Sequence, residues 1–225
     1  MGINKEKYGE IIDELKNKAI LVAVSKTKPV EDILELFHLG QRDFGENYVQ
    51  ELVDKQLQLP AGIHWHFIGH LQSNKVKYIA PFVYLIHGVD SLKLLQEINK
   101  QAAKLNKTID VLLQVHIAAE ETKFGFDEKE LDIFFGTGNN TLPGLKNITI
   151  KGLMGIASFT EDTATIKKEF SLLKQLFDKY ASLALPNSKF QLLSMGMSSD
   201  YKLAVTEGSN MVRIGSLLFG MREKK

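Results

Sequence analysis

Short apolar segments, typical of buried parallel strands, alternate with amphipathic helical segments along most of the chain. The apolar segments predict eight strands, at residues 19–26, 41–45, 63–69, 82–88, 109–117, 148–156, 190–194 and 211–214. Periodic patterns predict helices near residues 4–18, 30–39, 46–58, 73–80, 91–105, 127–135, 164–182 and 198–207. Eight strands with intervening helices favour an α/β fold, a (β/α)8 barrel of the TIM type, over a doubly wound open sheet. Periodicity alone does not close the barrel.

No proline- or serine-rich linker interrupts this alternation, and only a short helix follows the eighth predicted strand. We therefore expect one domain over residues 1–225 and no room for a second one.

The first predicted strand ends at a lysine. Residues 19–26 read Ala-Ile-Leu-Val-Ala-Val-Ser-Lys, and Thr27-Lys28-Pro29 and a helical pattern follow. A parallel strand of this kind delivers its last side chain to the carboxyl end of the sheet, where α/β folds place their chemistry. Burial there disfavours the ammonium form of Lys26, the nearby cation of Lys28 acts in the same direction, and a neutral amine attacks an aldehyde to form a Schiff base. The alternative, that Lys26 only ends a strand in solvent, stays open at this point.

The two predicted loops after strands seven and eight are rich in glycine and serine. Residues 194–200 read Ser-Met-Gly-Met-Ser-Ser-Asp, and Gly215-Ser216 follow the eighth strand. Barrels commonly bind phosphate with these two loops, because glycine lets the backbone approach an anion while hydroxyls and free N–H groups donate hydrogen bonds. A helix that starts near Ser198 would add such N–H groups. Taken singly, a Ser198 helix cap and a Gly215 turn are more common than a phosphate site.

Together, Lys26 and the two loops offer three points of contact for a phosphorylated aldehyde, and pyridoxal 5′-phosphate (PLP) is the obvious candidate. Arg213 ends the eighth strand beside them. Because a guanidinium only donates, it would keep a facing pyridine nitrogen unprotonated and make the ring a weaker electron sink. An ion pair of Arg213 with Glu46 or Glu207 is an equal alternative. An aldolase that uses Lys26 on a sugar phosphate would explain the same three points.

The composition narrows the function classes. The chain has 28 Lys and Arg residues against 27 Asp and Glu, so its net charge of +1 gives no global field for nucleic acid or an anionic membrane. It has no cysteine, which excludes disulfides, thiolate catalysis and cysteine-ligated metal centres. The charged first residues do not form a signal peptide, and no apolar run approaches about 20 residues. We expect a soluble cytoplasmic protein.

Six segments carry a resemblance to a known family. They read VAVSKTKP at 22–29, FGENYVQE at 44–51, WHFIGHLQ at 65–72, GLM at 152–154, LSMGMS at 193–198 and VRIGS at 212–216. On these segments the chain resembles the pyridoxal phosphate homeostasis proteins, the YggS and PROSC type, from about residue 4 to 223. The resemblance implies a fold-type III barrel like the amino-terminal domain of alanine racemase, without the carboxyl-terminal β domain of that enzyme.

The resemblance also implies roles for single residues. PLP is held as a Schiff base on Lys26, the first lysine of its motif. The family's other cofactor contacts fall on the phosphate-binding residues Ser198, Ser199, Gly215 and Ser216, on the ring-nitrogen partner Arg213 and on the cofactor-side residue Asn47. One departure lies in residues 114–125, where Lys123 and Gly125 match the family but His116 stands in place of the usual asparagine. This departure affects only the expected wall of the site, since Lys26 and the two phosphate loops match the family pattern.

Histidines offer one further candidate site. His64 and His66 alternate onto one strand face and His70 follows, a spacing that suits a metal pair. No carboxylate sits at a ligand spacing nearby, and the family carries no metal, so we expect packing or surface roles instead. His87 is predicted to face the barrel with nothing to pair it.

The resemblance leaves two classes of function. The favoured one is a carrier that binds and buffers PLP for vitamin B6 and amino-acid homeostasis, with apo forms of PLP-dependent enzymes as acceptors and no catalytic residues of its own. The alternative is a PLP-dependent amino-acid racemase or a related fold-type III enzyme. Racemases of this type take their second base, a tyrosine, from a β domain and a partner subunit, and this chain lacks that domain. We expect the carrier, as a monomer, with neither nucleic acid nor a membrane as partner.

Overall fold

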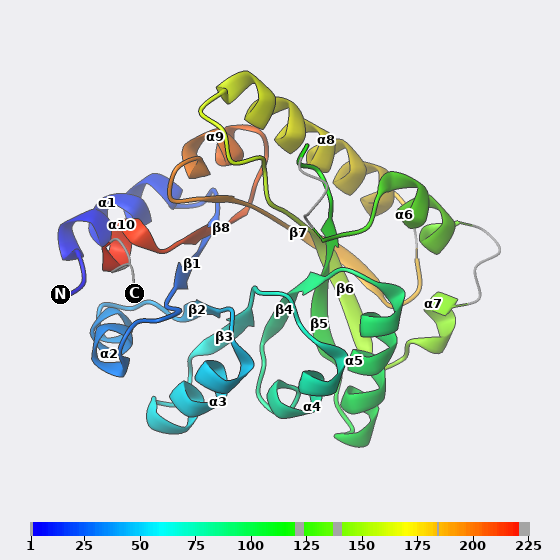
Figure 1. The fold of residues 1–225 in the computed structure, drawn as a ribbon, viewed down its shortest axis with the longest axis horizontal. Helices are drawn as coiled ribbons and strands as arrows, with labels where there is room; N and C mark the ends of the chain where they lie inside the picture. Colours follow the sequence, from blue (N-terminus) through cyan, green and yellow to red (C-terminus); the bar gives the residue numbers. More distant parts are fainter. Residues whose placement is uncertain (1, 120–123, 137–140, 184, 221–225) are drawn as a thin grey trace.

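Eight parallel strands close into a barrel in the computed structural model, which describes residues 2–119, 124–136, 141–183 and 185–220 (Figure 1). Each strand pairs with the next along the chain, and β8 pairs with β1. The strands are β1 (Ile20–Val24), β2 (Asp43–Glu46), β3 (His64–Phe67), β4 (Leu85–Val89), β5 (Ile109–Val115), β6 (Ile148–Gly155), β7 (Ser188–Met197) and β8 (Met211–Ile214). The predicted (β/α)8 barrel is therefore confirmed.

Helices follow the strands and surround the barrel (Figure 1). They are α1 (Lys5–Leu15), α2 (Val30–His38), α3 (Val49–Gln58), η1 (Ser73–Lys75), α4 (Val76–Ile79), α5 (Leu92–Lys104), α6 (Glu128–Phe135), α7 (Thr141–Gly144), α8 (Thr163–Ala181), α9 (Tyr201–Thr206) and α10 (Ser216–Phe219). In α5, for example, Leu94, Leu95, Ile98 and Ala102 are buried at helical spacing, and the Ser91 hydroxyl accepts the N–H of Leu94 at the start of the helix. In the described part of the chain, no helix is long and apolar enough to cross a membrane.

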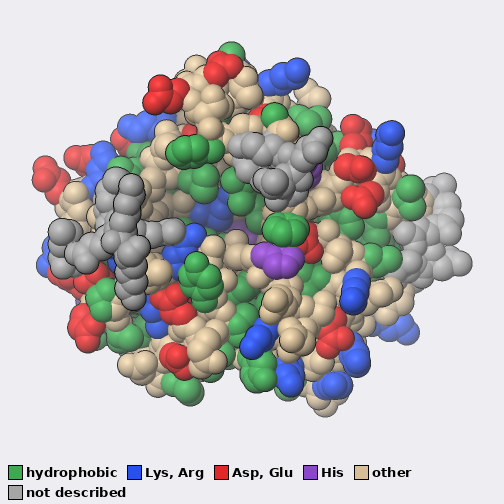
Figure 2. Space-filling model, viewed as in Figure 1, with side chains coloured by type: hydrophobic (Ala, Val, Ile, Leu, Met, Phe, Trp, Pro, Cys, Tyr) green, Lys and Arg blue, Asp and Glu red, His purple; other side chains and the backbone are tan. Residues whose placement is uncertain are grey.

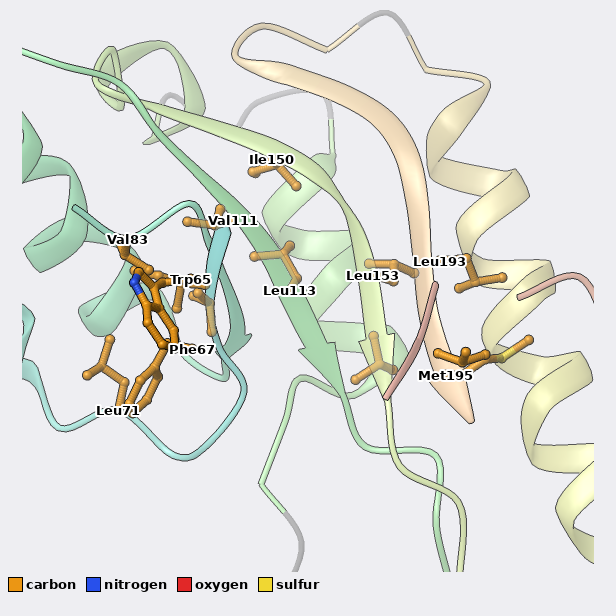
Figure 3. Packing of buried hydrophobic residues seen from close by; sticks show 14 of the residues in the cluster. Trp65, Phe67, Leu71, Val83, Val111, Leu113, Ile150, Leu153, Leu193 and Met195 are labelled. Atoms are coloured by element: carbon orange, nitrogen blue, oxygen red, sulfur yellow. The ribbon is translucent and has the colours of Figure 1, made fainter. Parts of the chain in front are cut away.

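Buried apolar side chains form two separate clusters. The large one includes Trp65, Phe67 and Leu113, whose packing is visible in Figure 3. The small one consists of Val22, Leu85, Leu112, Met154 and Met211. Because neighbouring residues of a strand face opposite sides of a sheet, Leu112 and Leu113 fall into different clusters. The large cluster therefore lies between the strands and the helices, and the small one fills part of the barrel interior.

The end of β7 departs from the prediction. The strand continues past its predicted end to Met197, and α9 begins at Tyr201 rather than near Ser198. Gly196 has φ +96°, and a Cβ at this position would collide with α9. Beyond it, the Asp200 carboxylate accepts the N–H of Met197 at 2.6 Å and turns the chain. Ser198 therefore lies in a loop and does not start a helix.

Candidate functional site

A pocket of about 560 Å³ lies at the carboxyl ends of the strands, where barrels place their sites. Its apolar walls include Val24 at the end of β1, Ile68 just after β3 and Ile156 just after β6. All seven residues that were predicted to bind a cofactor line this one pocket: Lys26, Asn47, Ser198, Ser199, Arg213, Gly215 and Ser216. Figure 2 shows the molecule hollowed near its middle, with Lys or Arg atoms inside the hollow.

Glu46, Glu51 and Lys55 hold the loop that carries Lys26, and we call these three residues the Lys26 clamp. The Lys55 ammonium donates to the carbonyl oxygen of Ser25 at 2.7 Å. It also donates to the carboxylates of Glu46 and Glu51, at 2.8 and 2.7 Å. The Ser25 hydroxyl donates to Glu46 at 2.6 Å. The residue that precedes Lys26 is thus bound to the clamp through both its backbone and its side chain.

Thr27, the residue that follows the lysine, has φ +63°, which is unfavourable for a β-branched side chain. Such a conformation costs roughly 1 to 3 kcal/mol and persists only where the surroundings enforce it. Here the N–H of Thr27 donates to the Glu51 carboxylate at 2.6 Å. The clamp therefore fixes the backbone on both sides of Lys26.

Glu46 is the most deeply buried member of the clamp, with 0% of its surface exposed. Burial raises the pKa of Glu46, while Lys55 and the hydroxyl of Ser25 oppose that rise. Its Oε2 atom has no hydrogen-bond partner within the described residues. Both glutamates belong to the FGENYVQE motif, but sequence reasoning missed Lys55. The available signal was the four-residue spacing from Glu51 to Lys55 in a predicted helix.

Lys28 lines the same pocket, and its ammonium group is engaged in hydrogen bonds. Its Nζ atom donates to the carbonyl of Phe219 at 2.7 Å and to that of Gly220 at 3.4 Å. The helix that ends at Phe219, α10, begins with Ser216 of the pocket. Lys28 therefore ties the far end of α10 to the loop after β1.

The loops after β7 and β8 meet at the pocket. The N–H of Gly215 donates to the hydroxyl oxygen of Ser198 at 3.2 Å. A Cβ on Gly215 would lie 3.3 Å from both Cβ and the carbonyl oxygen of Val24, so the close approach of β8 to β1 favours glycine. Ser199 and Ser216 expose their side chains beside these groups. Hydroxyls and backbone N–H groups from two loops thus converge, and neither loop contains Lys or Arg.

Arg213, on β8, lines the pocket although only 4% of its surface is exposed. Its Nη1 donates to the carbonyl and hydroxyl oxygens of Ser194 at 2.9 and 2.6 Å, and its Nη2 donates to the carbonyl of Gly155 at 2.9 Å. Burial lowers the pKa of Arg213 to about 10, so the side chain remains a cation at neutral pH. These partners are neutral, whereas Glu46 binds Lys55, and Glu207 binds Ser171 and Lys167. The alternative ion pair of Arg213 with Glu46 or Glu207 is therefore wrong.

Asn47 lies between the pocket and a side cavity of about 230 Å³, and it lines both. Its Oδ1 atom is buried and has no hydrogen-bond partner among the described residues. Gly69 packs against its backbone, since a Cβ there would lie 2.5 Å from the carbonyl oxygen of Asn47. His116, the departure from the family pattern, lines the side cavity. Lys123 lies outside the described residues.

Residues 5–223 match the family model described as alanine racemase, N-terminal domain. The chain is 42% identical over 212 residues to the pyridoxal phosphate homeostasis protein of Aquifex aeolicus, with 92% of this chain and 89% of that protein covered. It is 41% identical over 209 residues to the pyridoxal phosphate homeostasis protein of Pasteurella multocida, with 90% and 86% covered. The chain belongs to the pyridoxal phosphate homeostasis family. The resemblance inferred from the six motifs is confirmed.

A solved structure extends this comparison. PipY of Synechococcus elongatus, in its structure with PLP bound, matches this homeostasis-family chain with a TM-score of 0.86 and 34% sequence identity. The match covers 96% of this chain and 99% of PipY, so the two barrels correspond over nearly their whole length.

Two expectations about histidines are wrong in this homeostasis-family barrel. His64 and His66 both bond to Asp43, at 3.1 and 3.0 Å, so a carboxylate does lie beside them. His87 is fully buried and does have partners, His66 at 2.9 Å and the hydroxyl of Ser194 at 3.1 Å. Neighbouring strands β2, β3 and β4 bring Asp43, His66 and His87 together, and Ser194 on β7 reaches His87 from another part of the barrel. Spacing along the sequence does not display these contacts. Over the described ranges, no group of three His, Asp or Glu side chains is placed to hold a metal ion.

Proposed function

We propose that this homeostasis-family protein binds PLP in the pocket, carries and buffers it, and has no committed reaction of its own. One observation carries the proposal: an amine, a guanidinium and two glycine–serine loops converge on a single pocket of about 560 Å³. These groups match the aldehyde, the pyridine nitrogen and the phosphate of PLP. Relatives named for PLP homeostasis, and the structure of PipY with PLP bound, support the same ligand.

Lys26 holds the ligand covalently. Its neutral amine attacks the aldehyde carbon of PLP, the new C–N bond becomes the C=N bond of a Schiff base, and the aldehyde oxygen leaves as one molecule of water. The Lys26 clamp supports this step because the backbone on both sides of the lysine is already ordered.

Arg213 and Asn47 face the ring. A guanidinium has five N–H groups, and the hydrogen bonds of Arg213 to Ser194 and Gly155 use two on Nη1 and one on Nη2. One of the remaining N–H groups would donate to the pyridine nitrogen and keep it unprotonated, which would make the ring a weaker electron sink. Asn47 flanks the ring, and the ligand offers a partner for its side-chain amide.

Neutral donors hold the phosphate, because neither loop at the pocket contains Lys or Arg. Hydroxyl and backbone N–H groups bind a phosphate dianion through charge-assisted hydrogen bonds. The donors are Ser198, Ser199, Gly215 and Ser216.

The lining of the pocket favours carriage over racemisation. Racemisation needs a proton-transferring group on each face of the ring. Among the described residues that line the pocket there is no Tyr, His, Asp or Glu, and the amine of Lys28 is bound to backbone carbonyls. The carrier therefore keeps PLP without a second base and passes it to apo forms of PLP-dependent enzymes. A cytoplasmic location and a monomeric state stay predictions.

Absorbance spectra of the PLP-loaded protein test this function. Wild-type protein should show the visible band of a Schiff base, lose it on borohydride reduction, and yield a pyridoxyl-labelled peptide that contains Lys26. Lys26→Ala should lose both signals, whereas Lys93→Ala, a change at an exposed lysine of α5, should keep them. A label on Lys28 in place of Lys26, or no band in wild-type protein, would refute the proposal.

A further inference from the structure

Five polar side chains form one hydrogen-bonded series across the barrel. Asp43 Oδ1 lies 3.0 Å from His66 Nε2, and His66 Nδ1 lies 2.9 Å from His87 Nε2. His87 Nδ1 lies 3.1 Å from the hydroxyl oxygen of Ser194, which accepts from Arg213 Nη1 at 2.6 Å. The five residues lie on β2, β3, β4, β7 and β8, and we call the series the interior relay. It runs from the first residue of β2 to the pocket.

The charges at the two ends fix the direction of every hydrogen bond. Arg213 only donates, so the Ser194 oxygen accepts from it, and the hydroxyl proton of Ser194 stays available for a second partner. At the other end the Asp43 carboxylate only accepts, so His66 carries its proton on Nε2.

The direction of the hydrogen bond between His66 and His87 follows from the bond between His66 and Asp43. A neutral imidazole has one donor and one acceptor, so His66 Nδ1 accepts from His87 Nε2–H. His87 Nδ1 is then an acceptor and takes the hydroxyl proton of Ser194. Both histidines are then Nε2–H tautomers, and every ring nitrogen has a partner. No other assignment keeps Asp43 charged, both rings neutral and all four bonds in place.

Burial is consistent with these protonation states. Burial lowers the pKa of His66 and holds the pKa of His87 well below its ordinary value. Burial alone would raise the pKa of Asp43, but the hydrogen bonds from His66 and His64 outweigh it, and the pKa lies below its ordinary value. At neutral pH the relay therefore joins a cation and an anion through two neutral rings.

We propose that the interior relay positions the Arg213 guanidinium toward the pyridine nitrogen of PLP, with Asp43, His66, His87 and Ser194 as positioning residues. The inference rests on the proposed function. The carbonyl and hydroxyl oxygens of Ser194 both accept hydrogen bonds from Arg213 Nη1. His87 accepts the hydroxyl proton and so fixes the rotation of that hydroxyl. Without His87 the buried hydroxyl proton lacks an acceptor, so the hydroxyl turns away and Arg213 loses one of its supports.

The relay itself is testable in the apo-protein, without PLP. Long-range ¹H–¹⁵N spectra of histidine-labelled apo-protein at neutral pH should show His66 and His87 as neutral Nε2–H tautomers. A protonated ring, or an Nδ1–H tautomer at either residue, would overturn the direction of the relay.

Its role toward the ligand is tested with PLP and with 1-deaza-PLP, in which C–H replaces the pyridine nitrogen. His87→Phe should raise the apparent Kd for PLP by about three- to tenfold, the loss expected for one hydrogen bond, and leave the Kd for the deaza analogue unchanged. Ser194→Ala, which removes the hydroxyl that accepts from Arg213, provides a second variant with the same expected pair of results if His87→Phe does not fold. The matched control is His64→Gln, since His64 bonds to the same carboxylate outside the relay.

Equal losses for both ligands, no loss for PLP, or the same loss in His64→Gln would overturn the positioning role. Failure of the proposed function gives a different pattern, because wild-type protein would then bind neither ligand while the apo-protein spectra still report the tautomers.

Discussion

Lys55 is the residue whose removal tests the Lys26 clamp most directly. We consider Lys55→Met, which keeps most of the side-chain volume and removes the charge. The change deletes three hydrogen bonds, to Ser25, Glu46 and Glu51. It leaves Glu46 as a buried carboxylate without its cation, at a site where the lysine side chain is 6% and the glutamate side chain 0% exposed.

The expected magnitude follows from this burial. Removing one partner of a buried ion pair typically destabilises a protein by about 3 to 5 kcal/mol. The carboxylate of Glu51 is partly exposed, so water can replace its lost hydrogen bond. The carboxylate of Glu46 is fully buried, so it avoids the cost of an unpaired buried charge only by taking up a proton. We therefore expect Lys55→Met to lower the free energy of unfolding by about 3 kcal/mol, the lower end of that range.

Urea unfolding of the apo-protein at pH 7 measures this effect. The set comprises wild type, Lys55→Met, Glu46→Gln and the double variant. Because the double variant leaves no unpaired buried charge, it should be more stable than the sum of the single losses predicts, by at least about 1 kcal/mol. Lys100→Met provides the matched control, since Lys100 pairs with Glu97 at 3.7 Å on an exposed surface, and it should leave the unfolding midpoint unchanged. A loss below about 1 kcal/mol for Lys55→Met, or strict additivity in the double variant, would refute the account of the clamp.

Three further predictions concern the ligand, pH and side reactions. Ser198→Ala combined with Ser216→Ala should raise the Kd for PLP at least about tenfold, because two charge-assisted hydrogen bonds to the phosphate are lost. Pyridoxal without phosphate serves as the control, and equal binding of pyridoxal and PLP by wild-type protein would exclude a phosphate site. Since burial holds the pKa of His66 and His87 below its ordinary value, the unfolded chain binds more protons than the folded protein below about pH 6.5. Stability should therefore be complete above that pH and fall below it by up to about 1.4 kcal/mol per pH unit for each histidine, and urea midpoints that are equal at pH 7 and pH 5 would contradict this. With PLP-loaded protein, L-alanine and deuterated water, deuteration at the α-carbon should be about 10²- to 10⁴-fold slower than in a racemase that has both bases. Fast racemisation that Lys26→Ala abolishes would favour the enzyme over the carrier.

Much of the barrel could be predicted from the sequence because its signals are local. Eight short segments between helical patterns predicted the strands, and their alternation with the helices favoured a (β/α)8 barrel over an open sheet. Lys26 and the loops around Ser198 and Gly215 were found for the same reason, since each lies directly after a strand and strand ends share one face of the barrel.

The missed features depend on contacts between residues that lie far apart in the sequence. Ser194 bonds to His87 from 107 positions away, and Lys55 reaches Ser25 from 30 positions away. The spacing rules for a single strand or helix do not predict contacts over such sequence separations. These contacts depend on how the barrel closes and on which side chains of each strand face its interior. The start of α9 was misplaced for a related reason, since the φ of +96° at Gly196 becomes necessary only when α9 packs against β7.

The contact of Lys28 with Phe219 joins positions 191 residues apart and has a consequence for synthesis of the protein. Lys26 lies just after β1, whereas Arg213 and Gly215 belong to β8 and the loop after it, and β8 is the strand that pairs with β1. A growing chain on the ribosome therefore has no complete pocket until its last strand has emerged and docked. Closure over so long a separation carries a large entropic cost, and a ligand that binds only the closed barrel offsets it in proportion to RT ln(1 + [L]/Kd). On the proposed function, PLP thus stabilises the newly made protein once its barrel has closed, and the size of this stabilisation depends on the cellular concentration of PLP.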